Sequence, residues 1–198
     1  TPYVFLNAPV ANPTGAIYSR NELTELAAVA KSHHAKLILD MAFMELEFEA
    51  EKQWLKNLSS EGLQWVILAS ASKHFAAGGL RFGFGITNSL NLKQALLIGA
   101  TRQPHFTVLY AMKKLYHGLN LNQPEIVASL SEQRSLLKKR ADRFCKVLRD
   151  TGWSPLPPSG GLFVIARPER YIGRTIELPA AKFTIDGSNI AAVLMQTT

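Results

Sequence analysis

Three polar motifs stand directly after apolar segments of the sequence, and their side chains could bind a ligand or take part in catalysis. Asn-Pro-Thr-Gly covers residues 12–15, Asp40 follows an apolar run, and Ser-Ala-Ser-Lys covers residues 70–73, with Arg81 further along. Each motif alone has an ordinary explanation, as a turn, a helix cap or a surface cation. Because each falls at or just after the carboxyl end of a predicted strand, where open α/β sheets bind ligands, together they predict a ligand site.

The residue types match what the ring of pyridoxal phosphate requires. Its aldehyde needs an amine, which Lys73 supplies for a Schiff base. Its pyridinium nitrogen needs a carboxylate, so that the ring stays protonated and withdraws electrons, and Asp40 is that carboxylate. Its 3′-oxygen needs a hydrogen-bond donor, which is Asn12. These three side chains therefore form the predicted ring site.

The phosphate of the same cofactor needs hydroxyls and a cation. Ser70 and Ser72 carry hydroxyls, and the planar guanidinium of Arg81 matches the geometry of phosphate oxygens. Gly78 and Gly79 lack a Cβ and would let the backbone approach the phosphate closely. The complete predicted cofactor-binding set is Asn12, Asp40, Ser70, Ser72, Lys73 and Arg81, with Lys73 as the catalytic residue.

Strands and helices must position these side chains. Short apolar segments predict strands at 2–7, 36–40, 64–70 and 82–87. A Ser-x-x-Glu capping box at Ser19 and Glu22 opens a predicted helix over residues 20–34. Apolar strands that alternate with helices predict a mostly parallel sheet buried on both faces. The fourth strand follows the third too closely for a helical crossover, so we expect it to pair antiparallel.

The second half of the chain changes character. We expect helices at 91–101, 106–119 and 124–150, with Pro124 at the start of the last and Cys145 on its buried side. A turn-rich stretch and a strand at 161–166 follow. We therefore divide the chain into a partial cofactor-binding large domain, residues 1–120, and a long linking helix with a partial small C-terminal domain, residues 121–198.

In this order the motifs resemble the class I/II aminotransferases, which are fold-type I pyridoxal phosphate enzymes. The resemblance covers nearly the whole chain. It implies an α/β three-layer sandwich with a mostly parallel sheet, plus part of a smaller α+β C-terminal lobe. It assigns Lys73 as the Schiff-base lysine and implies an amino-acid substrate and a homodimer or higher homo-oligomer. It also implies that the chain is a fragment, inactive by itself, because other cofactor and substrate residues of this family lie outside it.

A narrower resemblance is to the aminotransferase-like C-terminal region of methionine S-methyltransferases. The segments that carry it lie at 2–19, 44–48, 78–84, 103–115 and 159–176. Those enzymes transfer a methyl group from S-adenosylmethionine to methionine in a separate N-terminal domain. This resemblance offers an alternative function, that of a catalytically weak or inactive domain with a regulatory or oligomerisation role.

Phe43 is where the chain departs from the family pattern. Active aminotransferases commonly have a tyrosine three residues after the aspartate, and its hydroxyl also bonds the 3′-oxygen. The sequence here is Asp-Met-Ala-Phe, and a phenyl ring cannot donate that bond. Losing a hydrogen bond to a charged group is worth about 1.5–3 kcal/mol. We expect weaker tuning of the lysine linkage, and this favours the alternative function.

The composition of the chain bears on three other kinds of partner, which are nucleic acid, metal ions and membranes, and on the location of the protein. A net charge of +7 is compatible with nucleic acid or a phosphorylated ligand, but the basic residues are dispersed, so we predict no nucleic-acid partner. No zinc-like spacing occurs, and we predict no metal. No run of 18 apolar residues occurs, so we predict no membrane partner. A single cysteine, Cys145, fits a reducing compartment, and we predict a cytoplasmic location.

Overall fold

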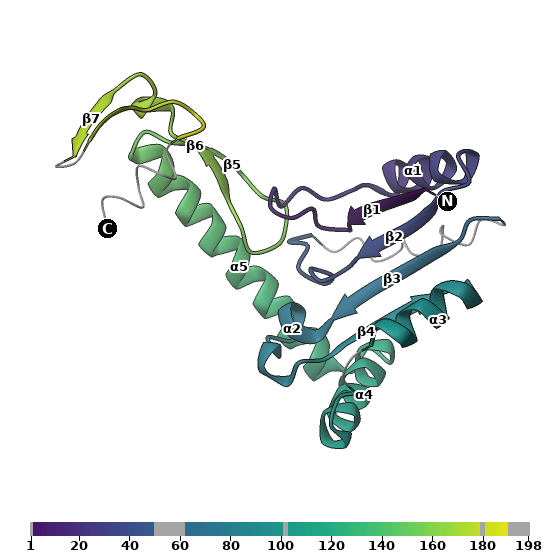
Figure 1. Ribbon diagram of the computed structural model, residues 1–198. Helices are drawn as coiled ribbons and strands as arrows, with labels where there is room; N and C mark the ends of the chain where they lie inside the picture. The colour runs from purple at the N-terminus through teal and green to yellow at the C-terminus, as the bar shows by residue number, and fades with distance from the viewer. Residues whose placement is uncertain (1, 50–61, 101–102, 179–180, 190–198) are drawn as a thin grey trace.

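A four-stranded mixed sheet forms the centre of the computed structural model, which describes residues 2–49, 62–100, 103–178 and 181–189 (Figure 1). Its strands lie in chain order: β1 (Tyr3–Asn7), β2 (Lys36–Asp40), β3 (Trp65–Ser70) and β4 (Gly83–Thr87). The first three are parallel, and β4 pairs antiparallel with β3, as its short connection predicts. The four predicted strands are therefore confirmed to within a residue at each end.

Helix α1 (Arg20–Ser32) covers one face of the sheet through Leu23, Ala27 and Ala30, which are buried. The predicted capping box is present, since the Ser19 side chain accepts from the backbone of Glu22 and the Glu22 side chain accepts from the backbone of Ser19. The helix ends two residues earlier than predicted. The physical reason is the left-handed conformation that the chain adopts just beyond it, at residue 34.

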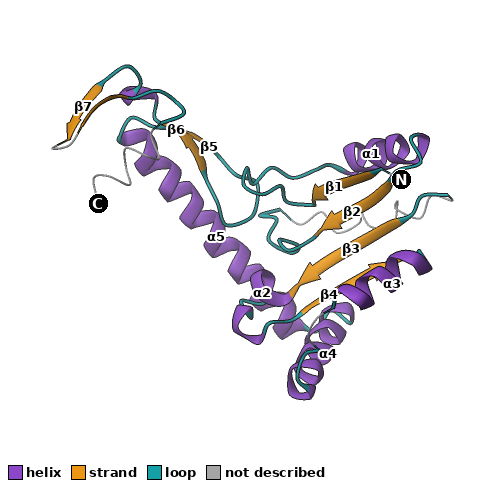
Figure 2. Cartoon of the chain, viewed as in Figure 1, coloured by secondary structure: helices purple, strands orange, loops and turns teal. Residues whose placement is uncertain are grey.

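The opposite face of the sheet carries helix α3 (Leu90–Gly99), so helices flank the sheet on both sides (Figure 2). A Cβ built on Gly85 of β4 would stand 2.8 Å from a methyl group of Leu96, which is how closely α3 approaches the sheet. The α/β layered architecture is thereby confirmed. Burial on both faces does not extend to β1, where Tyr3 and Phe5 each remain 57% exposed, because α3 lies at the β3–β4 side.

Two further helices follow, α4 (Phe106–Asn120) and α5 (Pro124–Asp150). The predicted bounds of α5 are confirmed, with Pro124 in its first turn. Cys145 is 2% exposed, as its place in the apolar pattern predicts. In Figure 1 α5 runs diagonally from the turn that follows β3 to the C-terminal strands. It therefore connects the central sheet with the last part of the chain.

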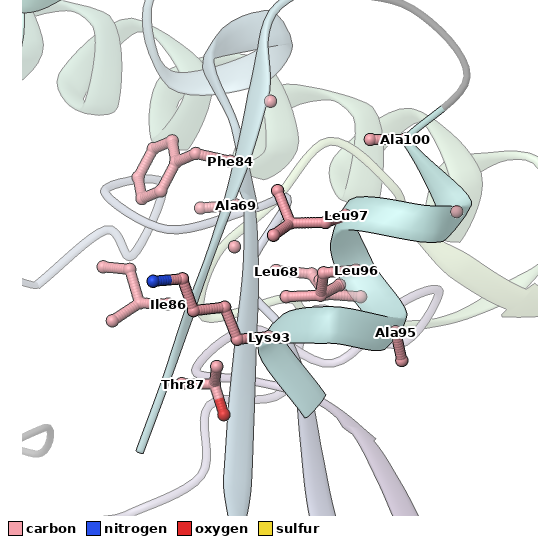
Figure 3. A pocket seen from close by; sticks show the side chains of 13 residues that line it. Leu68, Ala69, Phe84, Ile86, Thr87, Lys93, Ala95, Leu96, Leu97 and Ala100 are labelled. Carbon is pink, nitrogen blue, oxygen red and sulfur yellow. The ribbon is translucent and has the colours of Figure 1, made fainter. Parts of the chain in front are cut away.

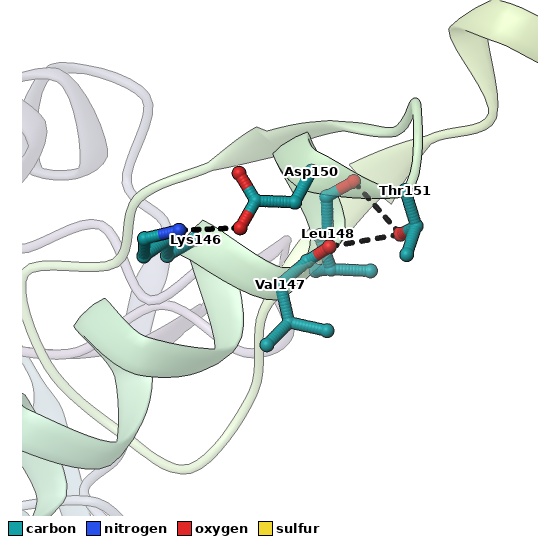
Figure 4. A network of polar contacts seen from close by, with 5 residues as sticks. All are labelled: Lys146, Val147, Leu148, Asp150 and Thr151. Atoms are coloured by element: carbon teal, nitrogen blue, oxygen red, sulfur yellow. Dashed lines mark hydrogen bonds and ion pairs between the residues drawn. The ribbon is translucent and has the colours of Figure 1, made fainter.

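The C-terminal end of α5 is closed by side chains. The Thr151 hydroxyl donates to the carbonyl oxygens of Val147 and Leu148, at 2.9 and 3.0 Å, and Lys146 pairs with Asp150 one turn apart (Figure 4). The two carbonyl oxygens also accept the backbone N–H groups of Thr151 and Trp153, so the Thr151 hydroxyl adds a second donor to each at the helix end. The chain then turns at residue 152 into the C-terminal strands.

Two small antiparallel pairs follow α5: β5 (Ser154–Leu156) with β6 (Ile165–Arg167), and β7 (Thr175–Leu178) with β8 (Ala181–Thr184). The predicted strand at 161–166 is wrong at its start, since β6 begins at Ile165. Residues 159–161 instead donate their backbone N–H groups to Gly15 and Leu46, outside any strand. Long-range docking of this segment therefore overrides its local preference for a strand.

Candidate active site

Asp40 ends β2 directly opposite Asn7, the last residue of β1. Asn7 Nδ2 donates to Asp40 Oδ2 at 2.9 Å, and the backbone N–H of Ala42 donates to Oδ1 at 3.0 Å. A carboxylate oxygen can accept more than one hydrogen bond, so both oxygens of Asp40 can still accept one from a ligand. The half-buried Asp40 is thus held at the sheet edge in a defined orientation. Asn7 lies 33 residues away in sequence, and no local signal marks it.

The Asn-Pro-Thr-Gly turn leaves the end of β1, and Asn12 on it is exposed. The Ala11 N–H donates to Ala16 O, and the Gly15 N–H donates to Ala11 O, each at 2.8 Å. The peptide bond between Asn12 and Pro13 is cis. Gly15 has a φ of +70°, and an added Cβ would lie 2.4 Å from that of Pro158. A glycine is therefore required here both by backbone conformation and by the approach of the C-terminal segment.

The Ser-Ala-Ser-Lys motif follows β3 as a single helical turn, α2 (Ala71–His74). Ser70 caps this turn by accepting the N–H of Ser72 at 3.2 Å, and its hydroxyl also donates to the Ser72 hydroxyl at 2.9 Å. Lys73 lies on the exposed side of the turn. The cap brings the two predicted phosphate hydroxyls together and fixes where α2 begins.

Arg81 follows the 3-10 turn η2 (Gly78–Leu80) and adopts a left-handed φ of +52°. Its Nη1 donates to Gly78 O at 3.1 Å, which uses one of the five N–H donors of the guanidinium. An added Cβ on Gly79 would meet nothing within 4 Å, and one on Gly78 would make only ordinary contacts. The protein itself therefore does not require glycine at 78 or 79, and their predicted role toward a phosphate stays a prediction.

Parallel pairing places the ends of β1, β2 and β3 on one side of the sheet (Figure 1). The residues that the sequence singled out follow these three ends: Asn12 after β1, Asp40 on β2, and Ser70, Ser72, Lys73 and Arg81 at and after β3. The structure thus gathers all of them along one edge, which is the edge where α/β sheets bind ligands.

Phe43 is buried, at 7% exposure, and packs with Val10 and Leu46. Its ring meets the ring of Phe163 edge to face, with centroids 5.9 Å apart. Both rings line a narrow space together with Asn12 and Gly15. Phe163 comes from the segment before β6, and the sequence did not identify it. The position where the family commonly has a tyrosine is therefore part of an apolar contact between the sheet edge and the C-terminal segment.

Two carboxyl groups lie on the loop that follows Phe43. Glu45 pairs with Arg134 of α5 at 3.0 Å, and both side chains are largely buried. Glu47 is 9% exposed, and burial raises the pKa of its carboxyl to about 7, with a smaller contribution in the same direction from the Glu45 charge. The Arg134 charge opposes this shift. The loop is thus tied to α5 by one ion pair and carries a second carboxyl group that titrates near neutrality.

A large groove lies elsewhere on the sheet. It has a volume of about 860 Å³ and runs between β3, β4 and α3 (Figure 3). Leu68, Leu96, Leu97 and Ile86 project around it, and Lys93 is the charged residue in its lining. None of the six predicted site residues lines this groove. The predicted site is therefore separate from this groove.

Among residues 2–49, 62–100, 103–178 and 181–189, no cluster of three or more His, Cys, Asp or Glu side chains has the arrangement to hold a metal ion. None of the helices in the described part of the chain is both long and apolar enough to span a membrane. The predicted donor set does fit pyridoxal phosphate, since it joins an amine, a fixed carboxylate, two adjacent hydroxyls and a guanidinium at one sheet edge.

The α/β sheet carries a lysine, an aspartate and a serine–arginine set along one edge. Comparison with known proteins identifies the class of protein that has this fold. The family model for aminotransferase class I and II matches residues 2–194. The chain therefore belongs to the class I and II aminotransferase family.

Individual relatives refine this result. The chain is 30% identical over 207 residues to the methionine S-methyltransferase of Hordeum vulgare and 29% identical over 192 residues to that of Arabidopsis thaliana. These alignments cover 100% and 96% of the chain, but only 19% and 18% of those enzymes. The chain thus spans about a fifth of the length of these curated relatives. The narrower resemblance seen in the sequence is confirmed.

Solved structures show the same fold. A tetra-mutant of Thermus thermophilus aspartate aminotransferase superimposes with a TM-score of 0.73 at 25% identity, covering 88% of this chain and 47% of that one. An aromatic aminotransferase from Pyrococcus horikoshii matches with a TM-score of 0.74 at 22% identity, covering 88% and 46%. The predicted aminotransferase fold class is confirmed.

Proposed function

We propose that this chain is a pyridoxal-phosphate-binding, aminotransferase-type domain that acts on an amino acid, with Lys73 binding the cofactor covalently through a Schiff base. The observation that carries the proposal is the shared sheet edge. Asp40 is fixed there at the end of β2 by Asn7, and Lys73 stands on the capped turn after the neighbouring strand β3. Membership of the class I and II aminotransferase family supports the same function.

Each residue at the edge has a definite task in this proposal. The bound cofactor supplies an electron sink for the bond that breaks at the substrate α-carbon. Asp40 holds a proton on the ring nitrogen, and Asn12 donates to the 3′-oxygen. Ser70, Ser72 and Arg81 bind the phosphate, where the guanidinium fork matches two oxygens. The Nζ amine of Lys73 would bind the cofactor and, when free, would hold and move the proton at the substrate α-carbon.

The wider proposal follows the family and the relatives. Residues 1–120 form part of the cofactor-binding domain, and residues 121–198 supply the linking helix and part of a smaller domain. The similarity to methionine S-methyltransferases over the whole chain supports a place in an enzyme of that kind. We propose that such an enzyme uses S-adenosylmethionine elsewhere in its length. A homodimeric or larger assembly in the cytoplasm completes the proposal.

One observation favours a second function. Phe43 is packed against Phe163 where the family commonly has a tyrosine, so one donor to the 3′-oxygen is missing. In this alternative the domain binds the cofactor but serves a regulatory or oligomerisation role within a methionine S-methyltransferase. Transamination with a common amino-acid donor decides between the two. Turnover supports the aminotransferase, and cofactor binding without turnover supports the alternative.

The test of the first proposal is spectroscopic. Pyridoxal phosphate is added to the full chain, and the visible absorbance band of the lysine-bound cofactor is recorded. We expect the band in the unmodified protein and not in Lys73→Ala. Lys93→Ala, which removes an exposed lysine on α3, is the matched control and should keep the band. A band that survives in Lys73→Ala, or that is absent from the unmodified protein, contradicts the proposal.

A further inference from the structure

The turn that carries Lys73 is too short to hold itself in place. Helix α2 has four residues, and an isolated helical turn fixes several dihedral angles for few hydrogen bonds. Its backbone contacts include the Ser70 cap at its start, a bond from the Ala71 N–H to Phe82 O at 3.2 Å, and bonds from the Phe75 and Ala76 N–H groups to the Lys73 carbonyl. The position of the Lys73 amine therefore depends on what other elements do to this turn.

Helix α5 binds the turn at Lys73 itself. Gln133 Nε2 donates to the Lys73 carbonyl oxygen at 3.1 Å, across 60 residues of sequence. The next residue of α5, Arg134, pairs with Glu45 on the loop after β2. Two adjacent residues of one helix thus contact two segments of the site. Arg134 binds the loop that follows Asp40, and Gln133 binds the turn that carries Lys73. Gln133 makes its bond to the main chain of Lys73, so the amine of the lysine stays unobstructed by it.

Helix α4 binds the turn at the next residue. The His74 side chain is fully buried, and its Nε2 lies 3.1 Å from the hydroxyl of Tyr116. Phe75 and Phe84 pack edge to face on the Tyr116 ring, with centroids 5.2 and 5.1 Å away. Such aromatic contacts add to the area that they bury. His74 is therefore held on α4 by one polar contact inside an apolar cluster.

The side chains of His74 and Tyr116 are both electrically neutral at pH values between their two pKa values. Burial lowers the pKa of His74 to about 4, which the backbone of Ser70 opposes only in part, and burial raises the pKa of Tyr116 to about 12. The donor in the contact is set by the tautomer of the imidazole. A neutral imidazole next to Lys73 places no second positive charge beside its amine.

We propose that Gln133 of α5 and Tyr116 of α4, the latter through His74, are positioning residues that aim Lys73 at the cofactor. This inference rests on the proposed function, because it takes Lys73 as the cofactor-binding lysine. It assigns a task to residues that lie outside the lysine motif and that contact the Lys73 carbonyl oxygen and the His74 imidazole. Through Gln133, the helix that leads to the C-terminal strands also sets the backbone of the reactive lysine.

The first test needs no cofactor. Amide hydrogen exchange is measured for the peptide that covers residues 71–77 in the apo form of the full chain. We expect about threefold to tenfold faster exchange in Tyr116→Phe and in Gln133→Met, because each loses one hydrogen bond. Tyr110→Phe, on the same helix and 53% exposed, is the matched control. Gln133→Lys keeps a donor at the end of a flexible side chain and should restore slow exchange.

The second test uses the same variants with pyridoxal phosphate. A shift in the apparent pKa of the visible band, together with threefold to tenfold weaker cofactor binding, is expected in Tyr116→Phe and Gln133→Met, and not in Tyr110→Phe or Gln133→Lys. Faster exchange with an unchanged apparent pKa of the visible band would overturn the inference. It would show that loosening the turn does not change the position of the Lys73 amine. Unchanged exchange in both variants would overturn it as well.

The two proposals fail in different ways. If the unmodified protein shows no Lys73-dependent band, the proposed function fails, whatever the exchange results are. If that band is present and all four variants titrate alike, the proposed function stands and the positioning inference is wrong.

Discussion

Asn7 Nδ2 lies 2.9 Å from Asp40 Oδ2, across the last paired position of the β1–β2 register. The bond joins two strand ends and fixes the direction of the carboxylate that the proposed cofactor needs at its ring nitrogen. Since strand pairing sets this contact, the sheet itself orients Asp40. The contact therefore supports the role that we propose for Asp40.

Replacing Asn7 should weaken cofactor binding. Asn7→Leu keeps a similar volume but removes a hydrogen bond to a charged group, worth about 1.5–3 kcal/mol. We expect the dissociation constant for pyridoxal phosphate to rise about tenfold or more, measured by absorbance titration. Asn91→Leu, which changes an exposed residue near the starts of β2 and β3, should bind as the unmodified protein does. Equal affinity in Asn7→Leu and Asn91→Leu would show that Asp40 needs no orientation from β1.

Phe43→Tyr tests the departure from the family pattern. The added hydroxyl supplies the donor that aminotransferases commonly direct at the 3′-oxygen, so we expect tighter binding of pyridoxal phosphate by about tenfold to hundredfold. Absorbance titration measures the affinity, and a transamination assay measures turnover. Turnover that appears only in Phe43→Tyr would show that Phe43 is the reason why the unmodified chain does not transaminate. Unchanged affinity would mean that packing against Phe163 keeps the new hydroxyl away from the 3′-oxygen of the cofactor.

Gly15→Ala should destabilise the fold. The residue has a φ of +70°, and the new Cβ would lie 2.4 Å from Pro158 Cβ and 2.7 Å from the Gly160 carbonyl oxygen. Left-handed strain and overpacking together cost about 2–4 kcal/mol. Urea unfolding measures the loss. Gly79→Ala is the control, since its Cβ would meet nothing within 4 Å. A loss that is the same in both variants would contradict the close docking of residues 158–160.

The stability of the protein should depend on pH through Glu47. The folded-state pKa of about 7 exceeds the ordinary value of 4.5 for a glutamate carboxyl, so the folded form holds more protons between these pH values than the unfolded form. Stability from this carboxyl is present below about pH 4.5 and is lost as pH rises through about 7, by an amount on the order of 3 kcal/mol.

Glu47→Gln removes that titration. We expect the variant to match the unmodified protein near pH 5 and to exceed it near pH 8 by about 2 kcal/mol, from urea midpoints at the two pH values. Glu49→Gln, an exposed site nearby, provides the control and should leave the pH profile unchanged. Parallel profiles for the unmodified protein and Glu47→Gln would show that Glu47 stays ionised when buried.

The strands and motifs were predictable because their signals are local. Each strand of the sheet is a short apolar run, and the Ser19–Glu22 capping box marks the start of α1 within four residues. The placement of the predicted cofactor residues along one edge was predictable because strand ends in parallel sheets share an edge, whereas their roles toward a cofactor stay predictions. The start of β6 was not predictable, since its local pattern competes with hydrogen bonds to Gly15 and Leu46.

The sequence by itself determined the elements and the chemical types at the site, because both depend on neighbours a few residues away. Only the tertiary structure decided what supports them: Asn7 on Asp40, Gln133 on Lys73, Tyr116 on His74 and Phe163 on Phe43. These partners come from distant segments. Strand register and helix packing bring them together, and hydrogen bonds and burial depend on positions in space that no local pattern encodes.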